Sequence, residues 1–267
     1  MRVFAAAPAV IGPGLDGWAT AREVLAGRRA FEPSPTVAPA AASLPPAERR
    51  RATAVIRLAV AAAAAAVESA GIADPSRLHS VFASADGDGA VIGSILTALA
   101  GAERVVSPTQ FHNSVHNSPA AYWAIGSGIG GASTSLGGWD GAFASGLLHA
   151  AAKAAARDEP VLLCAYDAPM PPPLSEVRVT TAAFAIAMLL TPRRQPSSLA
   201  GLDICLAAGP CPAEAAMPRG AGLRPIWRGN AAARSLRLLE AMAAGEAAVI
   251  GLDYLDDAHL AVDVQPC

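Results

Sequence analysis

Short apolar runs alternate with small-residue helical segments along most of this chain, and this alternation constrains the fold more than any single motif. Five runs are predicted to be strands, at residues 3–11, 78–84, 132–136, 160–166 and 180–190. The main helices between them are predicted at residues 47–70, 90–100 and 140–157, with shorter pieces at 18–26 (helix) and 104–106 (strand). Strands that alternate with helices form a mostly parallel sheet covered on both faces. We therefore expect an α/β fold with a mostly parallel five-stranded sheet in the order β-α-β-α-β-α-β-β.

The chain after residue 196 is less regular. A strand at 202–207 and a loop rich in Pro, Ala and Gly precede a helix at 231–244 and strands at 247–252 and 259–264. The last two strands are joined by a short connection, so we expect them to pair antiparallel. We predict a main domain at 1–195 and a reduced C-terminal portion at 196–267 packed on the same domain.

Composition excludes several classes of function. Hydrophobic residues make up 53% of the 267 residues, and the net charge is -2, which gives no basic footprint for nucleic acid. The four cysteines form no C-x-x-C pair, so we expect free thiols in a reducing cytoplasm. The apolar run at 54–71 is too short and too charged at its ends for a membrane span. The N-terminus lacks the apolar core of a signal peptide.

The stretch 108–146 concentrates polar side chains between apolar segments and glycines. Its first part, FHNSVHN, supplies five candidates for a pocket or interface: Phe111, His112, Asn113, His116 and Asn117. His112 and His116 have the spacing of a metal pair on a helix, but no third ligand accompanies them, so we predict no metal site. We interpret these side chains as hydrogen-bonding partners of buried loop backbone.

Two glycine- or aspartate-rich turns superficially resemble ligand loops. Gly126-Ser-Gly-Ile-Gly-Gly follows a helix and precedes a strand, the reverse of the order in a dinucleotide-binding fingerprint. Ala85-Asp-Gly-Asp-Gly lacks the remaining ligands of a calcium loop. We expect Asp86 and Asp88 to cap the helix that follows.

A tight turn, Ser135-Leu-Gly-Gly-Trp-Asp-Gly, leads from the strand at 132–136 into the helix at 140–157. It supplies the remaining candidates, Gly137, Gly138, Trp139 and Asp140. We expect Asp140 to cap this helix. Trp139 has two interpretations, a plug beside a tunnel or ordinary core packing.

In their order, these features resemble the N-terminal half of β-ketoacyl synthases, which are members of the thiolase-like superfamily. Four segments are more closely similar to the short chain length factor proteins of bacterial aryl polyene clusters: LPPAERRRAT, FHNSVHNSPAAYW, GGWDGAFASGLLHAA and CAYDAPMPPPL. The resemblance covers most of the chain to about residue 193. It implies a thiolase-like fold with a truncated second half.

The departures from the family concern its chemistry. A ketosynthase takes the acyl chain as a thioester on a cysteine at the sharp turn. Here the resemblance places Gly138 at or near the nucleophile position, and the turn contains no cysteine. The family also uses two histidines from the second half, where only His259 remains. We therefore predict no catalytic residue, no activity of the chain's own and no cofactor.

The resemblance also implies partners. We expect a heterodimer with a competent β-ketoacyl synthase, in which the edge strand at 132–136 extends the partner's sheet and FHNSVHN lies near the contact. The pair would shape the acyl pocket in fatty-acid-like aryl polyene or polyketide biosynthesis, with acyl carrier protein as a further partner. Two alternatives stay open. One is a stand-alone acyltransferase or hydrolase that uses Ser145 or Cys164 as nucleophile, and the other is a purely structural scaffold for the synthase.

Overall fold

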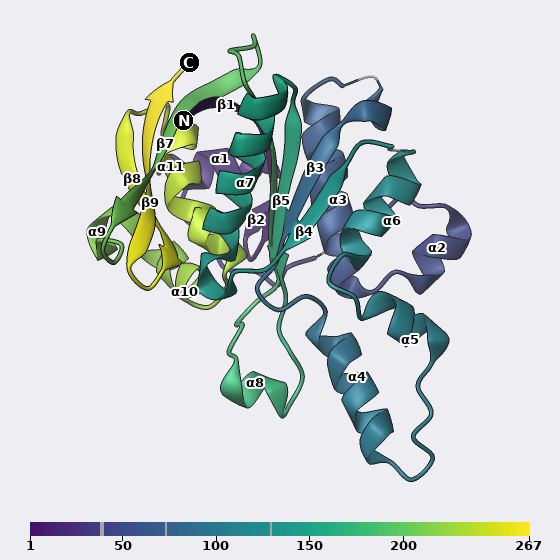
Figure 1. Ribbon diagram of the computed structural model, residues 1–267. Helices are drawn as coiled ribbons and strands as arrows, with labels where there is room; N and C mark the ends of the chain where they lie inside the picture. The colour runs from purple at the N-terminus through teal and green to yellow at the C-terminus, as the bar shows by residue number, and fades with distance from the viewer. Residues whose placement is uncertain (38–39, 73, 129) are drawn as a thin grey trace.

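The computed structural model describes residues 1–37, 40–72, 74–128 and 130–267, and its centre is one large sheet (Figure 1). The strands are β1 (Arg2–Gly12), β2 (Leu15–Asp16), β3 (His79–Ala83), β4 (Ser133–Leu136), β5 (Val161–Asp167), β6 (Phe184–Thr191), β7 (Ser198–Ala208), β8 (Ala248–Leu255) and β9 (Ala258–Pro266). All five strands expected in the first part are present. Residues 38 and 39, in the predicted loop before the long helix, and residue 129, in the glycine-rich turn, lie outside the described residues.

Helices lie on both faces of the sheet, as predicted (Figure 1). The α-helices are α1 (Trp18–Leu25), α2 (Pro46–Arg51), α3 (Ala54–Ser69), α4 (Gly89–Ala100), α5 (Pro108–Asn113), α6 (Ser118–Ser127), α7 (Ala142–Arg157), α8 (Leu174–Val177), α9 (Ala213–Ala216), α10 (Arg224–Arg228) and α11 (Leu236–Ala244). Short 3-10 turns are η1 (Pro75–Arg77), η2 (Trp139–Gly141), η3 (Ala221–Leu223) and η4 (Ala232–Ser235).

The sheet corrects two details of the prediction. Within the described residues it has nine strands, eight of them in the order β4-β3-β5-β6-β1-β7-β9-β8, with β2 paired to β1. Only β4 and β5 run parallel to their neighbour β3, whereas the other pairs are antiparallel. The reason is local: the link from β5 to β6 carries only the short helix α8 and no crossover helix, so the chain returns antiparallel.

The C-terminal residues extend the same sheet. β7 pairs with β1 over Arg2–Ala6, and β9 and β8 follow outward from β7. The antiparallel pairing of the last two strands, β8 and β9, is confirmed. The stretch predicted as a loop before residue 229 instead holds the short helices α9 and α10.

Two apolar layers hold the sheet. On one face, α3 packs on β5, β6 and β1 through its alanines, and α6, with the buried rings of Tyr122 and Trp123, packs against α3, β3 and β4. On the other, α7, α1 and α11 share a core with Phe143, Leu147 and Leu239. Because alanine has a short side chain and high helix propensity, these helices form readily and lie close to the strands.

The helix predicted over 47–70 is two helices. The backbone is extended at Ala52 and Thr53, and the Thr53 hydroxyl accepts a bond from the Ile56 N–H at 3.2 Å to start α3. The predicted strand at 104–106 is wrong, because this segment has no regular structure and links the projecting helix α4 to α5. No helix among the described residues is long and apolar enough to cross a membrane.

Candidate functional site

The turn between β4 and α7 lies at the ends of the parallel strands. Gly138 and Gly141 are packed so closely that a side chain at either position would crowd its neighbours. A Cβ at Gly138 would lie 2.7 Å from the Ser145 Oγ and 3.1 Å from the Ala142 Cα. A Cβ at Gly141 would lie 2.7 Å from the carbonyl oxygen of Tyr254 in β8. Gly138, the position that the resemblance matched to the nucleophile, therefore carries no reactive side chain and is tightly packed against Ser145 and Ala142.

Trp139 points away from the core of this chain. Its side chain is 65% exposed, and its φ is 51°, in the left-handed region that side-chain-bearing residues seldom adopt. The interpretation of Trp139 as ordinary core packing is wrong, because the turn reverses the chain at this residue and directs the ring outward.

An arginine that follows α8 holds this turn. Arg178 Nε donates to Asp86 Oδ1 at 3.0 Å, and its Nη1 lies 2.7 Å from Asp140 Oδ1. The guanidinium carbon lies 4.4 Å from the centre of the Trp139 ring, a cation–π distance. Burial lowers the pKa of Arg178, but hydrogen bonds and charges from Asp140 and Asp86 leave the pKa above its usual value.

These contacts correct two predicted caps. The Asp140 side chain makes no cap bond to α7 and binds Arg178 instead. Asp86 likewise binds Arg178 and Thr180, whereas Asp88 caps α4 as predicted by accepting from the Val91 N–H at 3.2 Å. One signal of the Asp86 pairing was present in the sequence, because a carboxylate so soon after a buried strand needs a partner.

A second arginine connects the turn to the C-terminal portion. Arg234 in η4 lies 3.6 Å from Asp140 Oδ2 and 3.7 Å from Asp253 Oδ2 of β8. Its guanidinium carbon lies 4.3 Å from the centre of the Trp227 ring. Asp140 thus lies between two arginines, and the turn is held from both portions of the chain.

Asp167, at the end of β5, is a buried carboxyl group beneath this network. Its Oδ1 accepts from the Ser84 hydroxyl at 2.7 Å and from the N–H groups of Ala85 and Asp86 at 2.9 and 3.2 Å. Burial, with a further contribution from the Asp86 charge, raises the pKa of Asp167 to about 7. Asp167 was not among the predicted candidates, although its place at the end of an apolar strand was a usable signal.

The FHNSVHN candidates divide into anchors and exposed groups. Asn113 is buried, donates to the Arg51 carbonyl at 2.9 Å and accepts from the Tyr122 hydroxyl at 3.1 Å. His116 Nε2 lies 3.1 Å from the Ser84 carbonyl oxygen, to which it can only donate. Asn113 and His116 therefore each donate to a backbone carbonyl group, and the two residues take part in separate contacts. Among the described residues, no group of His, Cys, Asp and Glu is arranged to hold a metal ion.

The other three candidates in that motif, Phe111, His112 and Asn117, are exposed. The His112 ring packs edge-on against Tyr122 at 6.2 Å, Asn117 precedes α6 without a side-chain cap, and Phe111 is 66% exposed. α4, α5 and α8 project from the same end of the molecule (Figure 1). Exposed apolar side chains on or next to these helices are Leu96, Leu99, Val105, Phe111, Val115, Val177 and Val179.

The two alternative nucleophiles lack suitable surroundings. Cys164 is fully buried in β5, its Sγ lies 3.5 Å from the Ala59 carbonyl oxygen, and burial raises the pKa of its thiol strongly. The Ser145 Oγ points at the closely packed Gly138. A buried, protonated thiol does not attack an acyl group, so Cys164 is inert in this fold.

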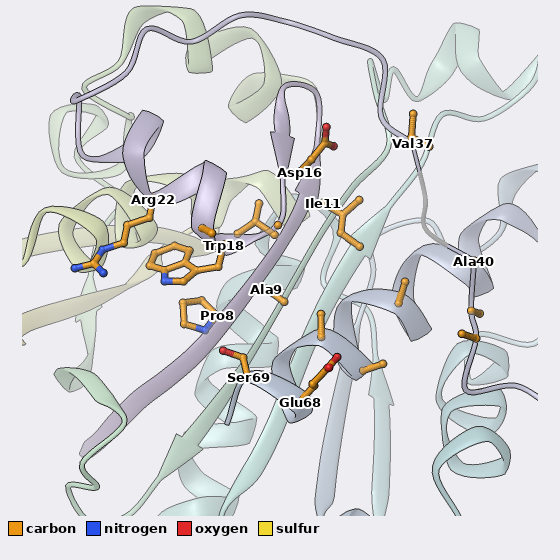
Figure 2. Close-up of a pocket in the computed structure, with 18 of the residues that line it drawn as sticks. Pro8, Ala9, Ile11, Asp16, Trp18, Arg22, Val37, Ala40, Glu68 and Ser69 are labelled. Atoms are coloured by element: carbon orange, nitrogen blue, oxygen red, sulfur yellow. The ribbon is translucent and has the colours of Figure 1, made fainter. Parts of the chain in front are cut away.

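A separate groove of about 1230 Å³ lies between α1 and α3, over β1 (Figure 2). Trp18 and Arg22 line one wall, and Glu68 and Ser69 lie at the end of α3. Alanines from α3 and from the loop before α2 make most of the remaining wall. The candidates from the sequence lie outside this groove.

Comparison with known proteins defines the class. The family model for the beta-ketoacyl synthase N-terminal domain matches residues 19–218, so this chain belongs to that family. Comparison with curated protein sequences gives no significant match. The thiolase-like fold is confirmed by similar solved structures.

Three of these structures illustrate the similarity. A ketosynthase in complex with its chain length factor from Xenorhabdus doucetiae matches with a TM-score of 0.73 and 20% identity, over 98% of this chain and 99% of that one. A type II polyketide acyl carrier protein in complex with its ketosynthase matches with a TM-score of 0.75 and 13% identity, over 100% and 99%. A beta-ketoacyl synthase from Burkholderia phymatum matches with a TM-score of 0.71 and 11% identity, over the full length of both chains.

Proposed function

We propose that this chain is a non-catalytic, chain-length-factor-like partner of a β-ketoacyl synthase in fatty-acid-like biosynthesis of an aryl polyene or polyketide. The observation that carries the proposal is the turn 137–141. The resemblance places the family's nucleophile at this turn, yet Gly138 has no side chain that could react, and the next residue is an outward-facing tryptophan.

The division of labour follows from this turn. The partner synthase supplies the cysteine that holds the growing chain, and acyl carrier protein delivers the extender units. This subunit closes part of the tunnel in which the chain grows. Elongation stops when the chain meets a bulky side chain, which is a steric effect that needs no reactive group here.

Two features provide a contact for the partner. β4 is at the end of the strand order, so its outer hydrogen-bonding edge is free to extend another sheet. The projecting end formed by α4, α5 and α8 carries exposed apolar side chains, including Phe111 and Val177. Exposed apolar patches of this kind mark protein contacts. The similar chain in the Xenorhabdus complex has about the same length as this one, as mutual coverage of 98% and 99% implies.

The cellular location and the division of the chain into two portions belong to the same proposal. The four cysteines are free thiols, which fits the cytoplasm, where acyl carrier protein would be available. Residues 1–195 would form the half that resembles the synthase, and residues 196–267 would be a reduced second portion.

Co-expression with the ketosynthases of the same genome tests the proposal. Size-exclusion chromatography with light scattering is expected to give a one-to-one complex with one of them. A chain that remains alone or forms only a homodimer beside every ketosynthase would contradict the proposal. If the complex is stable but substitutions in this subunit leave the length of its products unchanged, the subunit is a scaffold for the synthase.

A further inference from the structure

We propose that Arg178 is a positioning residue that holds Trp139 in its outward pose and, through that ring, sets where the partner's acyl chain stops growing. This inference rests on the proposed function and identifies the part of the turn on which the length limit depends.

The contacts of Arg178 form a three-way clamp. One edge of the guanidinium faces Asp86, with Nε at 3.0 and 3.3 Å from the two carboxylate oxygens. Its Nη1 faces Asp140 at 2.7 Å, and its flat face covers the Trp139 ring. A lysine has no planar, forked group and would not satisfy all three contacts together.

The Arg178–Asp86 pair of the clamp is largely shielded from water, whereas the Asp140 side chain is 43% exposed. The side chain of Arg178 is 14% exposed and that of Asp86 is 3% exposed. Asp86 is itself fixed, because its Oδ2 accepts from the Thr180 hydroxyl at 3.2 Å. Charge-assisted bonds are stronger where water is excluded, so the bond to Asp86 anchors Arg178 to the segment that follows β3, outside the turn.

Trp139 needs this support, because its backbone conformation is itself unfavourable. A left-handed φ of 51° costs on the order of 1 kcal/mol for a residue with a side chain. The ring is 65% exposed, so burial in this chain contributes little to its position. The contact with Arg178 covers one face of the ring and leaves the opposite face for apolar groups of a partner or its acyl chain.

A double-mutant cycle in the co-purified complex tests the inference, with product length as the readout. Trp139→Ala is expected to lengthen the products. Arg178→Ala is expected to raise the share of longer products about fivefold, as loss of one partly desolvated cation–π contact would. The double variant is expected to match Trp139→Ala alone, because Arg178 acts only through the ring. Arg193→Ala, which removes an exposed ion pair with Asp158, serves as control and is expected to change nothing.

The outcomes separate this inference from the proposed function. If Trp139→Ala lengthens the products and Arg178→Ala does not, Arg178 is not a positioning residue. If the complex forms but neither variant changes product length, the inference fails and the partnership stands. If no complex forms with the native chain, the proposed function itself fails. Should Arg178→Ala not fold, Arg178→Lys and Asp86→Asn weaken the same clamp more mildly, and unchanged lengths in both would overturn the inference.

Discussion

Replacing Asp167 by asparagine is expected to remove a pH dependence from the stability of this protein. The carboxyl group is 1% exposed, its Oδ1 accepts three hydrogen bonds, and no cation is among the causes that shift its pKa. Asparagine has the same shape and keeps the accepting oxygen, so it imitates the protonated acid.

The sign and size follow from linkage. Because burial raises the pKa of Asp167 from 3.8 to about 7, the folded state binds the proton more tightly than the unfolded state. The resulting stability is fully present below 3.8 and is lost as the pH rises through about 7. Between pH 5 and pH 8 the loss is roughly 2.7 kcal/mol, at about 1.4 kcal/mol per pH unit over the two units below the folded pKa.

Urea unfolding of both proteins at pH 5 and pH 8 measures this term. Other carboxyl groups contribute equally to the native and variant chains, so the difference between the two proteins isolates position 167. The free energy of unfolding of the native chain is expected to fall relative to that of Asp167→Asn by about 2 to 3 kcal/mol across this range. Parallel changes in the two proteins would refute the argument that Asp167 is protonated in the fold.

Three further predictions concern packing, thiols and capping. Gly141→Ala is expected to destabilise the fold by about 1 to 3 kcal/mol, because the new Cβ meets the Tyr254 carbonyl oxygen. Gly137→Ala, whose nearest neighbour would lie at 3.8 Å, is the matched control, and equal melting temperatures for the two would contradict the reasoning. With a thiol reagent at neutral pH, the exposed Cys205 and Cys267 are expected to react first. Cys211 is expected to react more slowly, because burial raises the pKa of its thiol to about 11. Cys164 is expected to react only after unfolding. Early labelling of Cys164, detected by peptide mass, would be inconsistent with its burial. Thr53→Ala is expected to lower the unfolding free energy by about 1 kcal/mol through loss of the α3 cap, whereas Ser107→Ala, which removes no cap bond, should leave it unchanged.

The parts of the fold that the sequence predicted well have strong local patterns. β5 and β6 are continuous apolar runs that are buried along their whole length, and α7 is a small-residue helix that begins at a glycine-rich turn. The break between α2 and α3 was missed because the helix-favouring residues continue on both sides of Thr53. Strand direction was missed because it depends on how the link 168–183 returns to the sheet, and no local pattern encodes that.

The contacts within the candidate stretch were predicted only in part, and its role as a site stays a prediction. The stretch 108–146 supplied the turn, the anchoring Asn113 and the edge strand β4. The clamp on Trp139 was missed because Asp86 and Arg178 are 92 positions apart and meet only when β3 and the loop after β5 are assembled. Asp140 was assigned to a helix cap because a local bond is the simplest use of an aspartate before a helix. A distant arginine binds it instead.

The most direct test of the account is intact-mass spectrometry of the co-purified complex after incubation with acyl-loaded carrier protein. The account predicts an acyl adduct on the partner synthase and none on this chain, since Gly138 carries no reactive side chain and Cys164 is buried. An acyl adduct on this chain, mapped to Ser145 or to any of its cysteines, would contradict the claim that its role is non-catalytic.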